Sequence, residues 1–180
     1  MKFADIEKFP QSYYRAEVEL KYLKEHLERW NERSLELPNH YLVMNPEWQR
    51  GHVWNQKQKI SFMEYFLKGG RTGRDVYFNC STWSSDYTTP IYCLDGLQRL
   101  STALEFLDNK VPVWGYYLRD FEDSIRLSGA NFSFNMLQIA NKRDLLKVYV
   151  DFNSGGTPHN PKEIKRVIEL IDQTDLNEKI

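Results

Sequence analysis

The stretch Tyr92-Cys93-Leu94-Asp95-Gly96-Leu97-Gln98-Arg99-Leu100-Ser101-Thr102 decides how this chain folds. Residues 90–94 are rich in strand-forming types, and Asp95-Gly96 marks a tight turn. Leucines then recur at positions 97, 100, 104 and 107, which is the spacing of one helix face. The stretch therefore predicts a strand that turns directly into a helix, with an acid, an amide and a guanidinium at the junction.

This junction is the strongest candidate for chemistry. The free amides at a helix N-terminus bind anions, and Gly96 would let a phosphate approach the backbone closely. Arg99 would grip phosphate oxygens, while Asp95 would orient the attacking group or hold Mg²⁺. Gln98 would help to orient that group, and the two hydroxyl residues after it are further phosphate-binding candidates, Ser101 and Thr102. The plainer alternative is that Asp95 only caps the helix and that Arg99 lies on the surface.

A second candidate segment is Trp48-Gln49-Arg50-Gly51-His52-Val53-Trp54, in a loop defined by Pro46 and Gly51. Gln49 and Arg50 would contribute to phosphate binding, and Trp48 and Trp54 could stack on a nucleotide ring. The alternative is that both tryptophans pack in the core while Arg50 is solvated.

A third candidate is the Gly-Gly turn in Asp151-Phe152-Asn153-Ser154-Gly155-Gly156-Thr157-Pro158-His159-Asn160. A binding loop would use Asn153, Gly156 and Thr157 to hold a polar ligand, with His159 as a weak acid-base candidate. The alternative is an ordinary connection between helices. The basic loop 69–74 (Gly-Gly-Arg-Thr-Gly-Arg) fits no phosphate-binding loop signature, so this is not a P-loop enzyme.

The remaining elements follow from apolar periodicity and capping residues. Ser12 would begin a long helix over residues 12–33, Asn55 would cap a helix that stops at Gly69-Gly70, and Asn160-Pro161 would begin the last helix. The other expected elements are strands over 41–44, 75–80, 90–94 and 111–118, and helices over 134–140 and 142–152.

Composition limits the function classes. The 180 residues carry 24 Lys and Arg against 25 Asp and Glu, a net charge of −1, so any nucleic-acid contact needs a local patch. No repeat or linker interrupts the chain, which predicts a single domain over 1–180 with an N-terminal helical segment (1–35) and a core (40–172). No apolar leader or membrane span is present, and Cys80 and Cys93 are isolated, so we expect a cytoplasmic protein with buried free thiols.

The three candidate segments, in this order and spacing, resemble the N-terminal domain of GmrSD-type modification-dependent restriction systems. That domain belongs to the ParB/sulfiredoxin-like superfamily, and the resemblance spans roughly residues 40 to 170. It implies an α+β fold in which several helices flank a small mixed sheet, with a nucleoside triphosphate pocket near the Asp-Gly-x-Gln-Arg junction. In the family this motif is linked to nucleotide hydrolysis coupled to DNA sensing, and the ParB and sulfiredoxin relatives use the same region for CTP and ATP.

Asp95, Gly96, Gln98 and Arg99 match the family's Asp-Gly-Gln-Gln-Arg signature, whereas Leu97 replaces its central glutamine. The restriction enzymes continue into an HNH-type nuclease domain. This sequence has no His-Asn-His constellation, so the resemblance implies a stand-alone domain that would need a nuclease partner subunit to cut DNA by that route.

Three functions follow as hypotheses. The first is a nucleotide-binding NTPase or phosphoryl-transfer enzyme that uses Mg²⁺ and is linked to DNA sensing, DNA modification or phage defence. The second is a ParB-like nuclease acting on DNA or RNA with the same residues. The third is a non-catalytic DNA-binding or inhibitor module, which the Leu97 departure favours.

Overall fold

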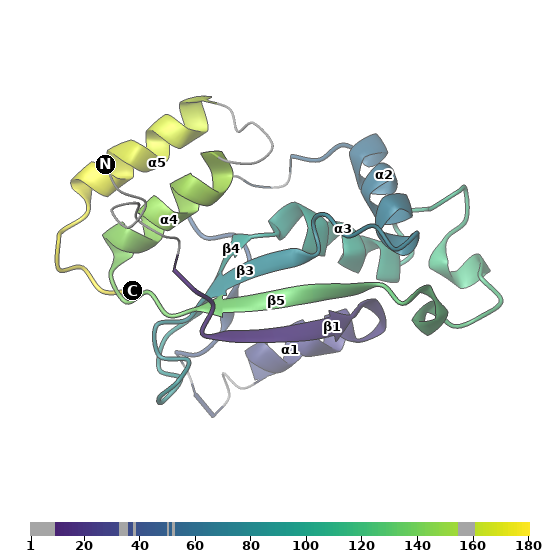
Figure 1. Ribbon diagram of the computed structural model, residues 1–180, viewed down its shortest axis with the longest axis horizontal. Helices are drawn as coiled ribbons and strands as arrows, with labels where there is room; N and C mark the ends of the chain where they lie inside the picture. The colour runs from purple at the N-terminus through teal and green to yellow at the C-terminus, as the bar shows by residue number, and fades with distance from the viewer. Residues whose placement is uncertain (1–9, 33–35, 38, 50, 52, 155–160) are drawn as a thin grey trace, which may run out of the picture.

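The computed structural model describes residues 10–32, 36–37, 39–49, 51, 53–154 and 161–180. Helices and strands are mixed along the chain in an α+β arrangement (Figure 1). Their bounds are β1 Tyr14–Glu19, α1 Leu23–Glu32, β2 Leu42–Val43, α2 Gln56–Leu67, β3 Asp75–Asn79, β4 Ile91–Asp95, α3 Leu97–Leu107, β5 Asn131–Leu137, α4 Lys142–Ser154 and α5 Pro161–Gln173, with 3₁₀ turns at Leu20–Tyr22, Leu118–Asp120 and Ile125–Ser128.

The strands form one mixed five-stranded sheet in the order β1-β5-β3-β4-β2. β5 pairs antiparallel with β1 and parallel with β3, while β4 pairs antiparallel with β3 and parallel with β2. The fold is therefore α+β with a small mixed sheet flanked by helices, as the family resemblance implied.

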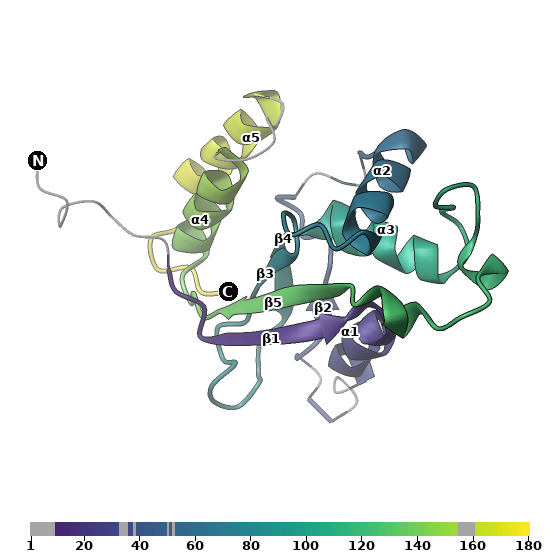
Figure 2. The same ribbon diagram turned by 45° about the vertical axis from the view of Figure 1, so that its right-hand side comes forward.

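Each face of the sheet has its own hydrophobic core. Phe132, Phe134 and Met136 of β5 pack with the buried residues of α1, α2 and α3. Leu137 and Leu94 belong to the second core, which α4 and α5 cover. Figures 1 and 2 show the α4–α5 pair on one side of the molecule and α2 with α3 on the other. The turn from β4 into α3 lies between these two groups of helices.

The predicted N-terminal helix is wrong over its first half. Residues 14–19 form β1, and the helix proper begins at Leu23. The apolar stripe that suggested a helix starts only at Leu20, whereas the residues before it pair in register with β5. Ser12 does not cap a helix, because its hydroxyl donates to Asn135 Oδ1 at 3.2 Å.

The predicted helix over 134–140 is also wrong, because residues 131–137 form β5. Phe132, Phe134 and Met136 alternate with polar residues, which is the two-residue period of a strand. That period is hidden when the pattern is read only from Phe134 onward, because the alternation stops at the two successive apolar residues Met136 and Leu137.

The strand expected over 111–118 does not form. Val113 and Tyr116 face each other in an isolated bridge around Trp114 and Gly115, whose φ values are 49° and 84°. Two successive residues with positive φ reverse the chain, so the alternation of Val111 and Val113 ends in a tight turn.

The other elements agree with the sequence. The strands at 41–44, 75–80 and 90–94 appear as β2, β3 and β4. Asn55 caps α2 in a capping box with Gln58, and α4 covers the helix predicted over 142–152. The last helix begins at Pro161, while its expected cap, Asn160, lies outside the described residues.

Candidate functional site

A cavity of about 410 Å³ opens where β4 ends and α3 begins. It is flanked by α4 on one side and by α2 with the loop at 72–73 on the other (Figure 1). Its lining is Gln49, Trp54, Phe62, Tyr65, Thr72, Gly73, Leu94, Asp95, Gly96, Leu97, Gln98, Arg99, Tyr149, Phe152 and Asn153. The structure thus brings described residues from all three candidate segments into one cavity.

The turn into α3 requires glycine for a reason other than ligand access. Gly96 is the N-cap of α3 and has φ of 118°, a left-handed conformation that L residues rarely adopt. A Cβ at this position would lie 2.5 Å from Val76 Cγ1. Gly96 is therefore needed to pack α3 against β3. Because a glycine cap brings no side chain, the first amides of the helix receive no side-chain cap at the cavity.

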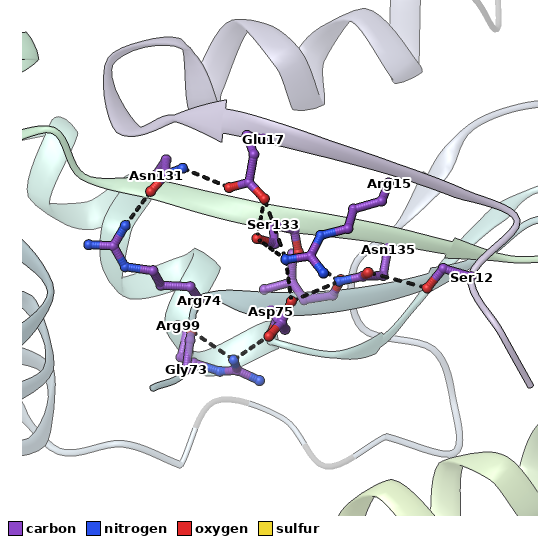
Figure 3. A network of polar contacts seen from close by, with 11 residues as sticks. Ser12, Arg15, Glu17, Gly73, Arg74, Asp75, Arg99, Asn131, Ser133 and Asn135 are labelled. Carbon is purple, nitrogen blue, oxygen red and sulfur yellow. Dashed lines mark hydrogen bonds and ion pairs between the residues drawn. The ribbon is translucent and has the colours of Figure 1, made fainter. Parts of the chain in front are cut away.

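Asp95 is not the N-cap of α3, since Gly96 occupies that position. The Asp95 side chain forms an ion pair instead. Arg99 Nη2 donates to Asp95 Oδ2 at 2.6 Å, and the side chains are 15% and 38% exposed respectively. Arg99 Nη1 also donates to the carbonyl oxygens of Gly73, at 2.8 Å, and Asp75, at 2.6 Å (Figure 3). The guanidinium thus joins the acid, the first turn of α3 and the start of β3.

A polar network continues from Asp75 across the sheet (Figure 3). Asp75 pairs in register with Ser133, and Ser133 with Glu17. The Asp75 carboxylate contacts Arg15 at 3.5 Å and accepts a hydrogen bond from Asn135 at 3.2 Å, while Ser133 donates to Glu17 at 2.5 Å. These contacts pair the two carboxylates with an arginine, an amide and a hydroxyl, so the network fixes the segment that Arg99 binds.

Gln98 holds the loop that precedes α2. Its Oε1 accepts hydrogen bonds from the amides of Val53, at 3.0 Å, and Trp54, at 3.2 Å. Its Nε2 donates to the Gly51 carbonyl at 2.9 Å. These three bonds place Trp54 at the cavity, where its ring packs against Phe62 with the centroids 5.3 Å apart.

Gln49 joins the same loop to the end of β4. Its Nε2 donates to the carbonyls of Cys93, at 3.3 Å, and Leu94, at 3.2 Å. Its Oε1 is buried and has no hydrogen-bond partner among the described residues. Cys93 itself is fully buried beneath the junction, and this burial strongly raises the pKa of its thiol. Cys80 and Cys93 are both free and buried, as the sequence predicted.

α4 supplies the opposite wall. Asn153 lines the cavity and donates from Nδ2 to the Tyr149 carbonyl at 2.7 Å. The ring of Phe152 packs on Tyr77 of β3 with centroids 4.7 Å apart. Burial, together with the nearby Asp75 and Asp95, raises the pKa of Tyr77, so this phenol stays neutral beside the site.

Several predicted residues do not reach the cavity. Thr102 is fully buried and donates its hydroxyl to the Gln98 carbonyl at 2.7 Å, and Ser101 is not part of the lining. Trp48 is buried against Tyr92, with centroids 5.2 Å apart, and borders a separate cavity of about 300 Å³. Arg50, Gly156, Thr157 and His159 lie outside the described residues.

Sequence reasoning gave no role at the site to eight residues of the lining, namely Phe62, Tyr65, Thr72, Gly73, Leu94, Leu97, Tyr149 and Phe152. The Tyr65 hydroxyl lies 2.6 Å from Thr72 Oγ1 and accepts the Thr72 amide at 3.2 Å, and these hydrogen bonds lower the pKa of Tyr65. Failure to match a P-loop pattern removed the glycine-rich loop from consideration. The available signal was that this loop directly follows a predicted helix with several aromatic residues.

The described residues contain no group of three or more acidic, histidine or cysteine side chains suited to a metal ion. Within that part of the chain, no helix is long and apolar enough to cross a membrane.

The fold and the cavity define a small α+β domain with a polar site at a strand-turn-helix junction. Residues 31–131, more than half of the chain, match the family model described as GmrSD restriction endonuclease, N-terminal domain, and the chain belongs to this family. The match covers the Gln49 loop and the Asp95 junction, whereas Asn153 and α4 lie beyond it. No curated protein and no solved structure matches the chain.

Proposed function

We propose that the cavity at the β4–α3 turn binds a nucleoside triphosphate and promotes phosphoryl transfer or hydrolysis. The observation that supports this proposal is convergence: Asp95, Gln49, Asn153 and the glycine-capped N-terminus of α3 share one cavity of about 410 Å³. This volume is within the range of small-molecule sites, roughly 300–1,000 Å³. The membership in a restriction-system family supports a nucleotide function linked to DNA sensing.

The phosphate end lies at α3 in this proposal. The first amides of the helix donate to phosphate oxygens, and the positive end of the helix dipole favours their charge. Arg50, the other cation that the sequence suggested for phosphate binding, lies outside the described residues. Arg99 has a different role from the one suggested by its sequence position, because its guanidinium is engaged by Asp95, Gly73 and Asp75. It positions the Asp95 carboxylate.

Asp95 is the reacting group of the proposal. Its carboxylate accepts a proton or a hydrogen bond from the attacking water, and Arg99 fixes its orientation. It is also the carboxylate in the described lining that could hold Mg²⁺, an ion commonly bound through one or two carboxylates together with substrate phosphates. The donor set thus fits Mg²⁺ delivered with the nucleotide, which would neutralise phosphate charge.

A nucleotide panel tests the proposal. The protein is mixed with ATP, GTP, CTP or UTP and Mg²⁺, with and without DNA, and is assayed for thermal stabilisation and phosphate release. We expect at least one nucleotide to raise the melting temperature and to release phosphate. Cleavage of DNA or RNA without nucleotide turnover would favour the ParB-like nuclease hypothesis. Salt-sensitive DNA binding without either activity would favour a binding module.

A further inference from the structure

Two groups of aromatic side chains line opposite sides of the cavity. Phe62 and Tyr65 come from α2, with Trp54 from the loop before it, while Tyr149 and Phe152 come from α4. Figures 1 and 2 both show α2 and α4 on opposite sides of the turn between β4 and α3. The cavity therefore has two aromatic walls above a polar floor.

The rings of both walls are held in place by packing. Phe62 stacks on Phe66 with centroids 5.5 Å apart and at an interplanar angle of 24°. Tyr65 is 43% exposed, and its hydroxyl is tied to Thr72. On the other wall, Phe152 is half-buried on Tyr77. Rings that are fixed by neighbours and remain accessible can stack on a planar ligand without first being ordered.

A nucleotide has one part that suits each region of this cavity. Its phosphates need donors, which the N-terminus of α3 provides, and its base is a planar ring that gains from aromatic contact. Trp48, the other tryptophan considered for stacking, is buried away from this cavity. Base contact therefore falls to Trp54, which the sequence suggested for stacking, and to cavity aromatics for which the sequence suggested no role.

We propose that the aromatic walls of α2 and α4 bind the nucleobase, with Phe152 and Trp54 as stacking residues, while α3 binds the phosphates. This inference rests on the proposed function and adds the orientation of the ligand. Stacking tolerates any base, because every base has a π face, so the walls provide affinity for nucleosides as a class.

The test compares ATP with inorganic tripolyphosphate, which has the phosphate chain and no base. Isothermal titration measures both ligands against the wild type, Phe152→Leu, Trp54→Leu and the matched control Phe121→Leu. Phe121 is 39% exposed and borders a different cavity, so its replacement changes ring content without touching this site. Leucine retains apolar packing, and melting curves verify that each variant is folded.

We expect Phe152→Leu and Trp54→Leu each to weaken ATP on the order of tenfold and to leave tripolyphosphate unchanged. Phe121→Leu should change neither. Equal weakening of both ligands, or unchanged ATP affinity in both variants, overturns the base assignment. If the wild type binds ATP no more tightly than tripolyphosphate, the base assignment fails and phosphate binding stands. If it binds neither ligand and none of GTP, CTP and UTP, the proposed function fails. If either Phe152→Leu or Trp54→Leu does not fold, the ATP and tripolyphosphate affinities of the other variant test the base assignment.

Discussion

Arg99 and Asp95 are joined across the first turn of α3, with Nη2 and Oδ2 2.6 Å apart, while the same guanidinium holds two backbone carbonyls at the start of β3. The pair therefore has two consequences. It sets the direction of the carboxylate that faces the cavity, and it fastens the helix to the neighbouring strand. Substitutions at the two positions should separate these consequences.

Arg99→Ala should destabilise the fold. The substitution removes three hydrogen bonds from a cationic donor, and hydrogen bonds of this type contribute about 1.5–3 kcal/mol each, not additively. We expect the free energy of unfolding, measured by urea denaturation, to fall by about 2–4 kcal/mol. Arg29→Ala is the matched control, because the Arg29 side chain is 65% exposed and, within the described part of the chain, forms an ion pair along its own helix with Glu25. A loss no larger than that of the control would contradict the fastening role.

Asp95→Asn should retain the fold and nucleotide binding, yet slow turnover. The amide can still accept a hydrogen bond from Arg99, and a partly exposed ion pair contributes about 1 kcal/mol or less. Because the lost carboxylate charge is the group that activates the attacking water in the proposal, the expected reduction is in kcat, by about a hundredfold or more. Phosphate release and melting temperature are measured for this variant and for the control Asp172→Asn, because Asp172 is exposed on α5. Unfolding of Asp95→Asn with normal activity per folded molecule would make Asp95 purely structural.

Gln98→Ala should loosen the loop at 51–54. The three hydrogen bonds of the Gln98 side chain are the contacts that tie Gly51, Val53 and Trp54 to α3. We expect faster hydrogen exchange at the Val53 and Trp54 amides and a loss of about 1–2 kcal/mol in unfolding free energy. Gln138→Ala is the matched control, because it removes one hydrogen bond that the Gln138 side-chain amide donates to the Ser84 hydroxyl. Unchanged exchange at both amides would show that another contact holds the loop.

The sequence predicted the elements around the junction because local signals there agree. The strand residues before Asp95, the glycine at the turn and the leucine stripe after it all indicate one structure. Two of the errors, at β1 and β5, occurred where pairing between distant strands determines the secondary structure. β1 has a single buried apolar residue, Val18, and its strand conformation comes from antiparallel pairing with β5, which lies more than a hundred residues away. Local periodicity does not contain that information.

The site was predictable in part for the same reason. Asp95, Gln49 and Asn153 were found as polar residues in loops and at helix ends, and they do line one cavity. Thr102 belongs to the same segment as Asp95, but the helix directs its side chain toward the core. Of the aromatic walls only Trp54 was predicted, because Phe62 and Tyr149 belong to helices whose apolar residues indicate only a core. Which apolar residue of a helix faces the cavity depends on how α2 and α4 pack around the β4–α3 turn, and local sequence does not contain that arrangement.

Gly96→Ala should be much more damaging than an alanine at another left-handed glycine. Positive φ costs roughly 1–2 kcal/mol for an L residue, and the overlap with Val76 adds a further cost of roughly 1–3 kcal/mol. Gly115→Ala is the control, because Gly115 has φ of 84° and no atom within 4 Å of its Cβ position. In a Val76→Ala background the cost of Gly96→Ala should fall. Equal costs at the two glycines in urea denaturation would show that the close approach of Val76 is unimportant.

The buried thiol beneath the junction should make stability depend on pH in the alkaline range. Burial raises the pKa of Cys93 above its ordinary value of 9.0, and the negative charge of Asp95 acts in the same direction. Below pH 9 the thiol is neutral in both folded and unfolded chains, so its contribution is fully present. As the pH rises above about 9, only the unfolded thiol ionises, and the free energy of unfolding falls by up to about 1.4 kcal/mol per pH unit.

Cys93→Ala removes this dependence, although it lowers stability at neutral pH by leaving a small void. Urea denaturation between pH 7 and pH 10.5 measures the difference in slope between wild type and variant, which cancels the tyrosines and lysines that titrate in both. Identical slopes would show that the thiolate is tolerated in the folded state, and hence that water reaches the floor of the cavity below Asp95.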